Sequence, residues 1–126
     1  MNGMRMGVAL GCAVLLLSAA LEADAATARV RCRVRLAPAR VQISVDGRDL
    51  APGSYTATVT SAAGSVTSAA QAAVGDQAEF DFDSDADNIA AGATRISATF
   101  AGVGEMVIGM VDGPTPASGS AQCVAK

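Results

Sequence analysis

A run of aspartates at every second position is the first feature of this sequence that could carry chemistry. The run comprises Asp81, Asp83, Asp85 and Asp87. Its spacing begins like the D-x-D-x-D loop that binds calcium through carboxylate oxygens. The loop is not completed, because Ala86 stands where its turn requires glycine and Gly92 stands where the closing glutamate should be.

Strand geometry further limits what these aspartates could bind. Carboxylates two residues apart on one strand face are separated by about 6.6 Å, too far to share an ion held at about 2.4 Å. Asp83, Asp85 and Asp87 could converge only where the chain turns, so they are weak candidates for a calcium site. The alternative is a solvated strand edge and loop, and we expect this alternative, with no metal and no cofactor.

Histidine is absent from the sequence. A Ser-His-Asp or Cys-His catalytic site is therefore excluded, and the commonest acid-base group in enzymes is missing. An enzyme built from carboxylates alone would need a paired acid and base in a cleft, usually on a larger scaffold. We expect a protein that is not an enzyme.

A second charged row has the opposite sign and the same spacing. It comprises Arg29, Arg31, Arg33 and Arg35. These arginines could bind a polyanion such as lipopolysaccharide, an acidic glycan or an anionic membrane surface. Alternatively, they protect an edge strand, or they face the acidic strand from Glu79 to Asp83 across one sheet. We predict that the two strands share a sheet, with their charged faces on one side and at least one arginine in contact with a carboxylate.

The overall charge argues against nucleic-acid binding, because the formal net charge is -3. Of three cysteines, Cys32 and Cys123 lie in the part of the chain expected to remain after export, and we predict that they form a disulfide. Two free thiols or a metal pair are the alternative, although no histidine could complete a zinc site.

The first 25 residues are typical of a signal peptide. Arg5 precedes an apolar stretch over residues 7–17, and Ala23-Asp24-Ala25 forms an A-x-A cleavage pattern. Cleavage after Ala20 and a lipoprotein box ending at Cys12 are weaker alternatives. We therefore expect a helical signal peptide over residues 1–25, an unpaired Cys12, and a periplasmic or extracellular mature chain without a transmembrane anchor.

Residues 26–126 alternate between apolar and polar in a way that predicts strands. The expected strands cover residues 29–36, 41–45, 55–60, 65–73, 78–84, 95–101, 105–111 and 117–124. Residues 85–94 are expected to form a polar loop or one helical turn. The result is one all-β domain, an immunoglobulin-like β-sandwich of seven or eight short antiparallel strands.

Four segments carry a resemblance. Ile43-Ser44-Val45-Asp46-Gly47 followed by Gly53-Ser54-Tyr55 is similar to the strand, turn and G-x-Y pattern of many bacterial β-sandwich modules. Together with the segments 79–83 and 89–92, it resembles short exported bacterial β-sandwich proteins of unassigned function. The resemblance implies a β-sandwich and carries no catalytic residue across.

These observations lead to a non-catalytic binding or structural module, located in the cell envelope or outside the cell. Its partner would be an envelope polymer or a protein. One alternative is a small inhibitor that projects the loop 85–94 into the cleft of an extracytoplasmic enzyme. Another is a calcium-dependent domain.

Overall fold

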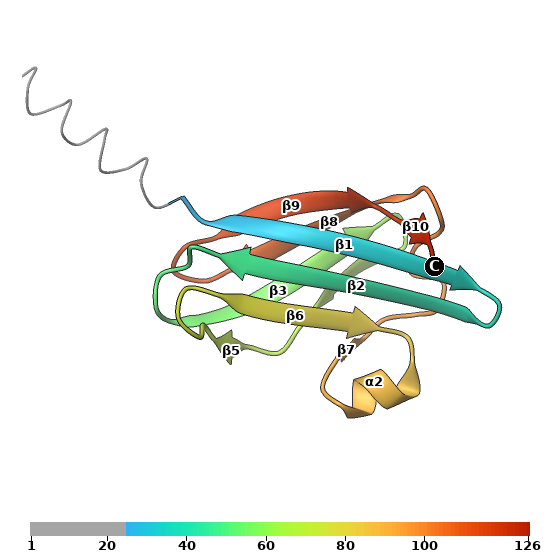
Figure 1. Ribbon diagram of the computed structural model, residues 1–126, viewed down its shortest axis with the longest axis horizontal. Helices are drawn as coiled ribbons and strands as arrows, with labels where there is room; N and C mark the ends of the chain where they lie inside the picture. Colours follow the sequence, from blue (N-terminus) through green and yellow to red (C-terminus); the bar gives the residue numbers. More distant parts are fainter. Residues whose placement is uncertain (1–24) are drawn as a thin grey trace, which may run out of the picture.

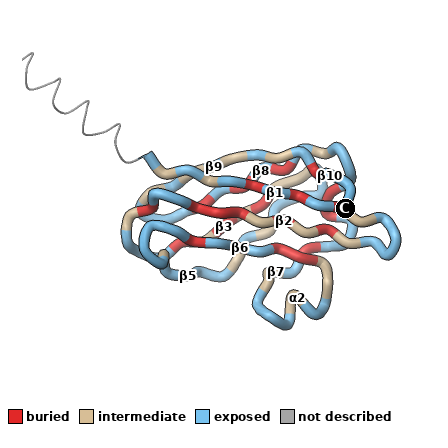
Figure 2. The backbone as a smooth tube through the Cα atoms, in the orientation of Figure 1, coloured by how far each residue is buried: buried red, intermediate tan, exposed pale blue. Residues whose placement is uncertain are grey.

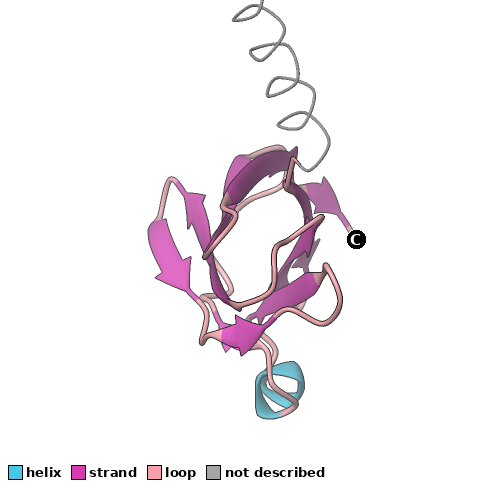
Figure 3. Cartoon of the chain, turned by 90° about the vertical axis from the view of Figure 1, so that its left-hand side faces the viewer, coloured by secondary structure: helices cyan, strands magenta, loops and turns pink. Residues whose placement is uncertain are grey.

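The computed structural model describes residues 25–126 and shows two β-sheets packed face to face. Figure 1 shows one sheet in front of the other, and Figure 3 shows the two layers from one end. The signal peptide predicted over residues 1–25 and the predicted state of Cys12 fall outside the described residues, apart from Ala25. Within residues 25–126, no helix is long and apolar enough to cross a membrane.

The first sheet has the strand order β10-β1-β2-β6-β7. Its strands are β10 (Val124–Ala125), β1 (Thr27–Leu36), β2 (Ala39–Arg48), β6 (Ala78–Asp83) and β7 (Thr94–Arg95). The long central pair β1 and β2 is antiparallel over ten residues of each strand. This sheet holds both charged rows.

The second sheet is built around β3 and β8. Its strands are β4 (Gly64–Thr67), β3 (Ser54–Ser61), β8 (Met106–Asp112) and β9 (Ala117–Gln122), with β5 (Gln71–Ala72) also paired to β3. Strands β3 and β4 form an antiparallel hairpin that turns between Ser61 and Gly64.

The core lies between the sheets, where every second residue of the long strands points inward (Figure 2). Val41, Ile43 and Val45 of β2 are fully buried, as are Ala57 and Val59 of β3. Phe80, Phe82 and Phe100 supply aromatic volume to the same core. The alternation read from the sequence therefore identifies the buried faces correctly.

The strand count and directions need correction. Residues 25–126 form ten strands, and two pairs of these strands are parallel, namely β1 with β10 and β6 with β7. The expectation of seven or eight antiparallel strands missed these pairs because β7 and β10 have two residues each, too few to show an alternating pattern.

The strand predicted over residues 95–101 is wrong beyond Arg95. Ile96 and Phe100 are buried as expected, but Ala98 is exposed and the segment turns. The side-chain hydroxyl of Ser97 accepts a hydrogen bond from the N–H of Thr99. The main-chain carbonyl of Ser97 accepts one from the N–H of Phe100. Such local bonds compete with pairing in a sheet.

Strand β8 lies centrally in its sheet, between β3 and β9. Its outer face is nevertheless exposed, and it presents Met106, Ile108 and Met110 to solvent. Both faces of β8 are therefore apolar although only its inner face is buried.

The Cys32–Cys123 disulfide is present and joins β1 to the last segment of the chain, with 4.5 Å between the Cα atoms. The pairing predicted from the sequence is confirmed. Because disulfides persist in oxidising compartments, the bond indicates a location outside the cytoplasm.

Candidate functional site

The two charged rows lie on the outer face of one sheet, as predicted. Strand β2 separates β1 from β6, and the register aligns Arg29 with Asp46 and Glu79, and Arg31 with Ser44 and Asp81. Residues that are directly opposite in neighbouring strands point to the same face. We call Arg29, Arg31, Arg33 and Arg35 the arginine row, and Glu79 with Asp81 the acidic row.

The contact between the rows differs from the expected one. Arg31 forms an ion pair of 3.6 Å with Asp46 of the intervening strand β2. Within residues 25–126, no ion pair joins the arginine row to the acidic row. Two strand spacings of about 4.8 Å keep the rows apart, so the face is positive along β1 and negative along β6.

Asp83 continues the acidic strand but is not a solvated carboxylate, contrary to expectation. It is 1 % exposed and accepts two hydrogen bonds from Arg40, at 3.0 and 2.7 Å. The side chain of Asn88 donates a third bond of 2.7 Å, and the N–H of Asp85 donates a fourth of 2.9 Å. These partners come from β2 and from the helical turn that follows β6.

The electrostatics of this cluster favour the ionised carboxylate. Burial alone would raise the pKa of Asp83, but the hydrogen bonds from Arg40, Asn88 and Asp85 outweigh it and lower the pKa to about 2. The hydrogen bond to Asp83 raises the pKa of Arg40. A carboxylate that stays ionised and fully bonded is not poised to act as an acid or base near neutral pH.

The other two calcium candidates, Asp85 and Asp87, lie at the start of a short helix. Asp85 caps the short helix α2 (Ala86–Ala90) by accepting a hydrogen bond from the N–H of Asn88, and Asp87 lies in the first turn of that helix. A helical turn was one of the two predicted states of this segment. In the part of the chain that the structure describes, no group of three or more possible metal ligands comes together.

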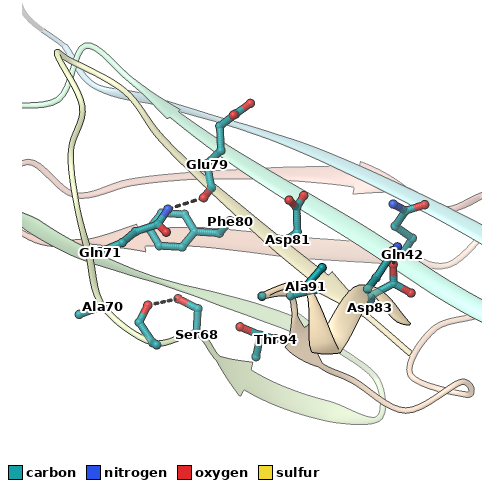
Figure 4. A pocket seen from close by; sticks show the side chains of 14 residues that line it. Gln42, Ser68, Ala70, Gln71, Glu79, Phe80, Asp81, Asp83, Ala91 and Thr94 are labelled. Atoms are coloured by element: carbon teal, nitrogen blue, oxygen red, sulfur yellow. Dashed lines mark hydrogen bonds between the residues drawn. The ribbon is translucent and has the colours of Figure 1, made fainter. Parts of the chain in front are cut away.

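A groove of about 540 Å³ lies beside β6, and Figure 4 shows the side chains that line it. We call it the β6 groove. The segment 68–71 lies on one side and the segment 91–94 on the other, and Glu79, Phe80 and Asp81 lie along it. Its volume is within the range of ligand pockets.

The main chain of β6 is open toward this groove. On the side away from β2, pairing with β7 involves only Phe82 and Asp83. The carbonyl of Asp83 accepts a hydrogen bond from the N–H of Ile96, which shows that the main-chain groups of Asp83 point away from β2. Because this direction alternates along a strand, those of Asp81 and Glu79 point the same way.

Two of these groups are already occupied. The side chain of Gln71 donates a hydrogen bond to the carbonyl of Glu79. The carbonyl of Asp81 accepts the hydrogen bond from the N–H of Thr94 that pairs Phe82 with Thr94 in the parallel ladder. Among residues 25–126, the N–H of Asp81 has no hydrogen-bond partner on this side. The β6 groove therefore exposes the unbonded main-chain N–H of Asp81 beside the exposed carboxylates of Glu79 and Asp81, while both main-chain carbonyls are held.

Sequence reasoning missed the buried cluster and the groove. The signal for the cluster was weak but present, since Arg40 follows the turn after β1 and Asn88 lies five residues after Asp83. The groove had no sequence signal, because it depends on where β7 begins and on how the segment 68–71 crosses β6.

The chain was compared with protein-family models, with curated proteins and with solved structures, and none of these comparisons gives a match.

Proposed function

We propose that the protein is an exported, non-catalytic binding module of the cell envelope or the extracellular space. The observation that carries the proposal is the β6 groove, which is lined by the exposed carboxylates of Glu79 and Asp81 and receives the unbonded main-chain N–H of Asp81. The buried cluster of Asp83, Arg40 and Asn88 beside the groove supports a non-catalytic role. Its carboxylate is hydrogen-bonded to Arg40 and to Asn88 of α2, and these bonds hold α2 against the sheet.

The disulfide and the fold suit this role. A bond that closes nearly the whole described chain keeps a small domain folded in an oxidising compartment. We place the mature protein in the periplasm or outside the cell, and we interpret its sandwich as immunoglobulin-like. It differs from antibody domains in its two parallel strand pairs and in a disulfide that does not join two interior strands across the sheets.

A capture experiment tests the proposed function. The tagged full chain, expressed for export, is cross-linked and purified from the exported fraction, and what it retains is identified. We expect a retained partner that is lost when Glu79 and Asp81 are both changed to lysine. The matched control is Asp112→Lys, an exposed acidic position on the other sheet, which should keep the partner.

Other outcomes of the same capture have different meanings. Retention of an acidic glycan that is lost in Arg31→Glu/Arg33→Glu would assign binding to the arginine row. Absence of any specific partner in all variants would contradict a binding role and leave a structural one.

A small inhibitor is the second candidate, and the position of α2 favours it. The helical turn projects from the β6–β7 edge of the first sheet (Figure 1), and the bonds of Asp83 to Arg40 and Asn88 hold it in place. A rigid protruding turn suits insertion into a cleft. Capture of one enzyme in stoichiometric amount, lost in Asp87→Lys and retained in Glu79→Lys/Asp81→Lys, would establish this candidate instead.

A further inference from the structure

We infer that the arginine row binds an acidic polysaccharide whose chain lies along β1. The inference goes beyond the proposed function, since β1 contributes no residue to the β6 groove. It depends on three features of the outer face of the first sheet, namely the uncompensated charges of the row, a hollow beside the row, and the acidic row that borders the same face.

The charges of the arginine row are largely uncompensated. Arg31 pairs with Asp46 at 3.6 Å, and the other three arginines of the row form no ion pair within residues 25–126. Neighbouring members of the row have Cα atoms about 6.8 Å apart, and like charges this close repel one another. A ligand with several negative groups would relieve the repulsion, because each guanidinium can bond two oxygens of a carboxylate or sulfate.

A hollow of about 210 Å³ lies beside the row on the same face. Arg31 and Arg33 line it on one side and Asp81 lines it on the other, with Gln42 and Ser44 of β2 between them. The register places Ser44 opposite Arg31 and Gln42 opposite Arg33, so a neutral polar group stands next to each cation. Sugar hydroxyl groups can donate hydrogen bonds to Ser44 and Asp81. The hollow therefore suits an anionic ligand that also carries hydroxyl groups.

The acidic row argues against a flat anionic partner. It lies on the same face as the arginine row, two strand spacings or about 9.6 Å away. A membrane surface would cover both rows, and its negative head groups would meet Glu79 and Asp81 as well as the arginines. A single polymer chain can instead follow β1 over the length of the row, about 20 Å from residue 29 to residue 35, and leave the acidic row in solvent.

The same face has no aromatic side chain. The one tyrosine and the three phenylalanines of the sequence are all buried in the core. Single-stranded nucleic acids bind by stacking their bases on aromatic side chains in addition to charge contacts. This face lacks such a platform, so its affinity for a polymer must come from charge and hydrogen bonds, which an acidic polysaccharide supplies.

Oligosaccharides of defined charge test this inference directly. The probe is a linear hexamer of galacturonic acid, which carries one carboxylate on each sugar, and its methyl ester is the uncharged control. Binding to the folded protein is measured by calorimetric titration at low ionic strength, where charge contacts are least screened. We expect the acid to bind at least tenfold more tightly than the ester. Equal binding of the two, or no binding of the acid at millimolar concentration, would overturn the inference.

Matched variants assign the binding to the row. Arg29→Gln/Arg33→Gln removes two exposed charges that form no ion pair among the described residues. This variant should bind the hexamer at least fivefold more weakly, with a shallower dependence on salt. The control is Arg95→Gln, an exposed position on β7 at the far edge of the same sheet, which should bind within about twofold of the unmodified protein. Equal losses in both variants would mean that binding follows net charge alone, and would overturn the inference.

Other anionic ligands test the class of the partner. Vesicles of phosphatidylglycerol and a six-nucleotide oligothymidylate should each bind at least threefold more weakly than the hexamer. Ser44→Ala removes a hydroxyl group from the hollow, so it should weaken the hexamer at least threefold and leave the oligothymidylate unchanged. Vesicle or oligothymidylate binding as tight as that of the hexamer, or no effect of Ser44→Ala on the hexamer, would overturn the assignment to a polysaccharide.

A failure here remains distinguishable from a failure of the proposed function. Glu79→Lys/Asp81→Lys, which should lose the partner in the capture experiment, leaves the arginine row intact and should not weaken the hexamer. Weaker binding of the hexamer by this variant would place the oligosaccharide at the β6 groove and would contradict the inference.

Discussion

Replacing both Cys32 and Cys123 by serine should lower the free energy of unfolding by about 4 to 5 kcal/mol. The bond spans 91 residues, and closing a loop of this length removes much of the conformational freedom of the unfolded chain. A loss of this size is comparable to the whole net stability of many small domains. We therefore expect the variant to be largely unfolded at 37 °C.

Urea denaturation followed by circular dichroism measures the effect. The unmodified protein, treated with a reductant, should lose the same stability as the serine variant, and the variant itself should not respond to the reductant. A difference below about 1 kcal/mol between oxidised and reduced protein would contradict this prediction.

Asp83→Asn should be the most damaging single change in the polar part of the protein, with an expected loss of about 3 to 5 kcal/mol near neutral pH. The change removes the charge that pairs with Arg40, and Arg40 is itself largely buried, with its side chain 16 % exposed. Breaking a buried pair by removing one partner leaves an uncompensated charge. Asp81→Asn on the same strand face is the matched control, and it should change stability by less than about 0.5 kcal/mol.

The effect of Asp83 should depend on pH in a defined direction. Its pKa falls from an ordinary 3.8 to about 2 in the folded protein, so folding favours the ionised form by about 2 kcal/mol. This contribution is complete above about pH 5 and is lost as the pH falls through 4 toward 2. The stability difference between the unmodified protein and Asp83→Asn should therefore shrink over this range. A difference that stays constant down to pH 2 would contradict the low pKa.

The sequence was most informative where alternation is long. Val30, Cys32 and Val34 alternate with arginines over a whole strand, so the buried face of β1 and its disulfide could be predicted. The same reasoning placed Phe80 and Phe82 in the core, and Glu79 with Asp81 outside it. The sheet shared by the two charged rows followed from the complementarity of their charges.

Short and non-local features could not be predicted. Asp83 occupies an outward position in the strand pattern, but Arg40 and α2 cover it, and this covering depends on residues more than forty positions apart in the chain. Strand β7 has two residues, and its late start at Thr94, which leaves the N–H of Asp81 without a partner, has no signature in local sequence. The β6 groove therefore became visible only when the two sheets were placed together.

The central claim is that the β6 groove is open to a partner at Asp81, whose main-chain N–H has no hydrogen-bond partner among the described residues. Hydrogen exchange of the individual backbone amides, measured by NMR on the folded protein, tests it most directly. The amides of Phe80 and Phe82, whose main-chain groups face β2, should exchange slowly, and the amide of Asp81 should exchange rapidly. Protection of Asp81 equal to that of Phe80 and Phe82 would mean that this edge is closed, and it would contradict the account.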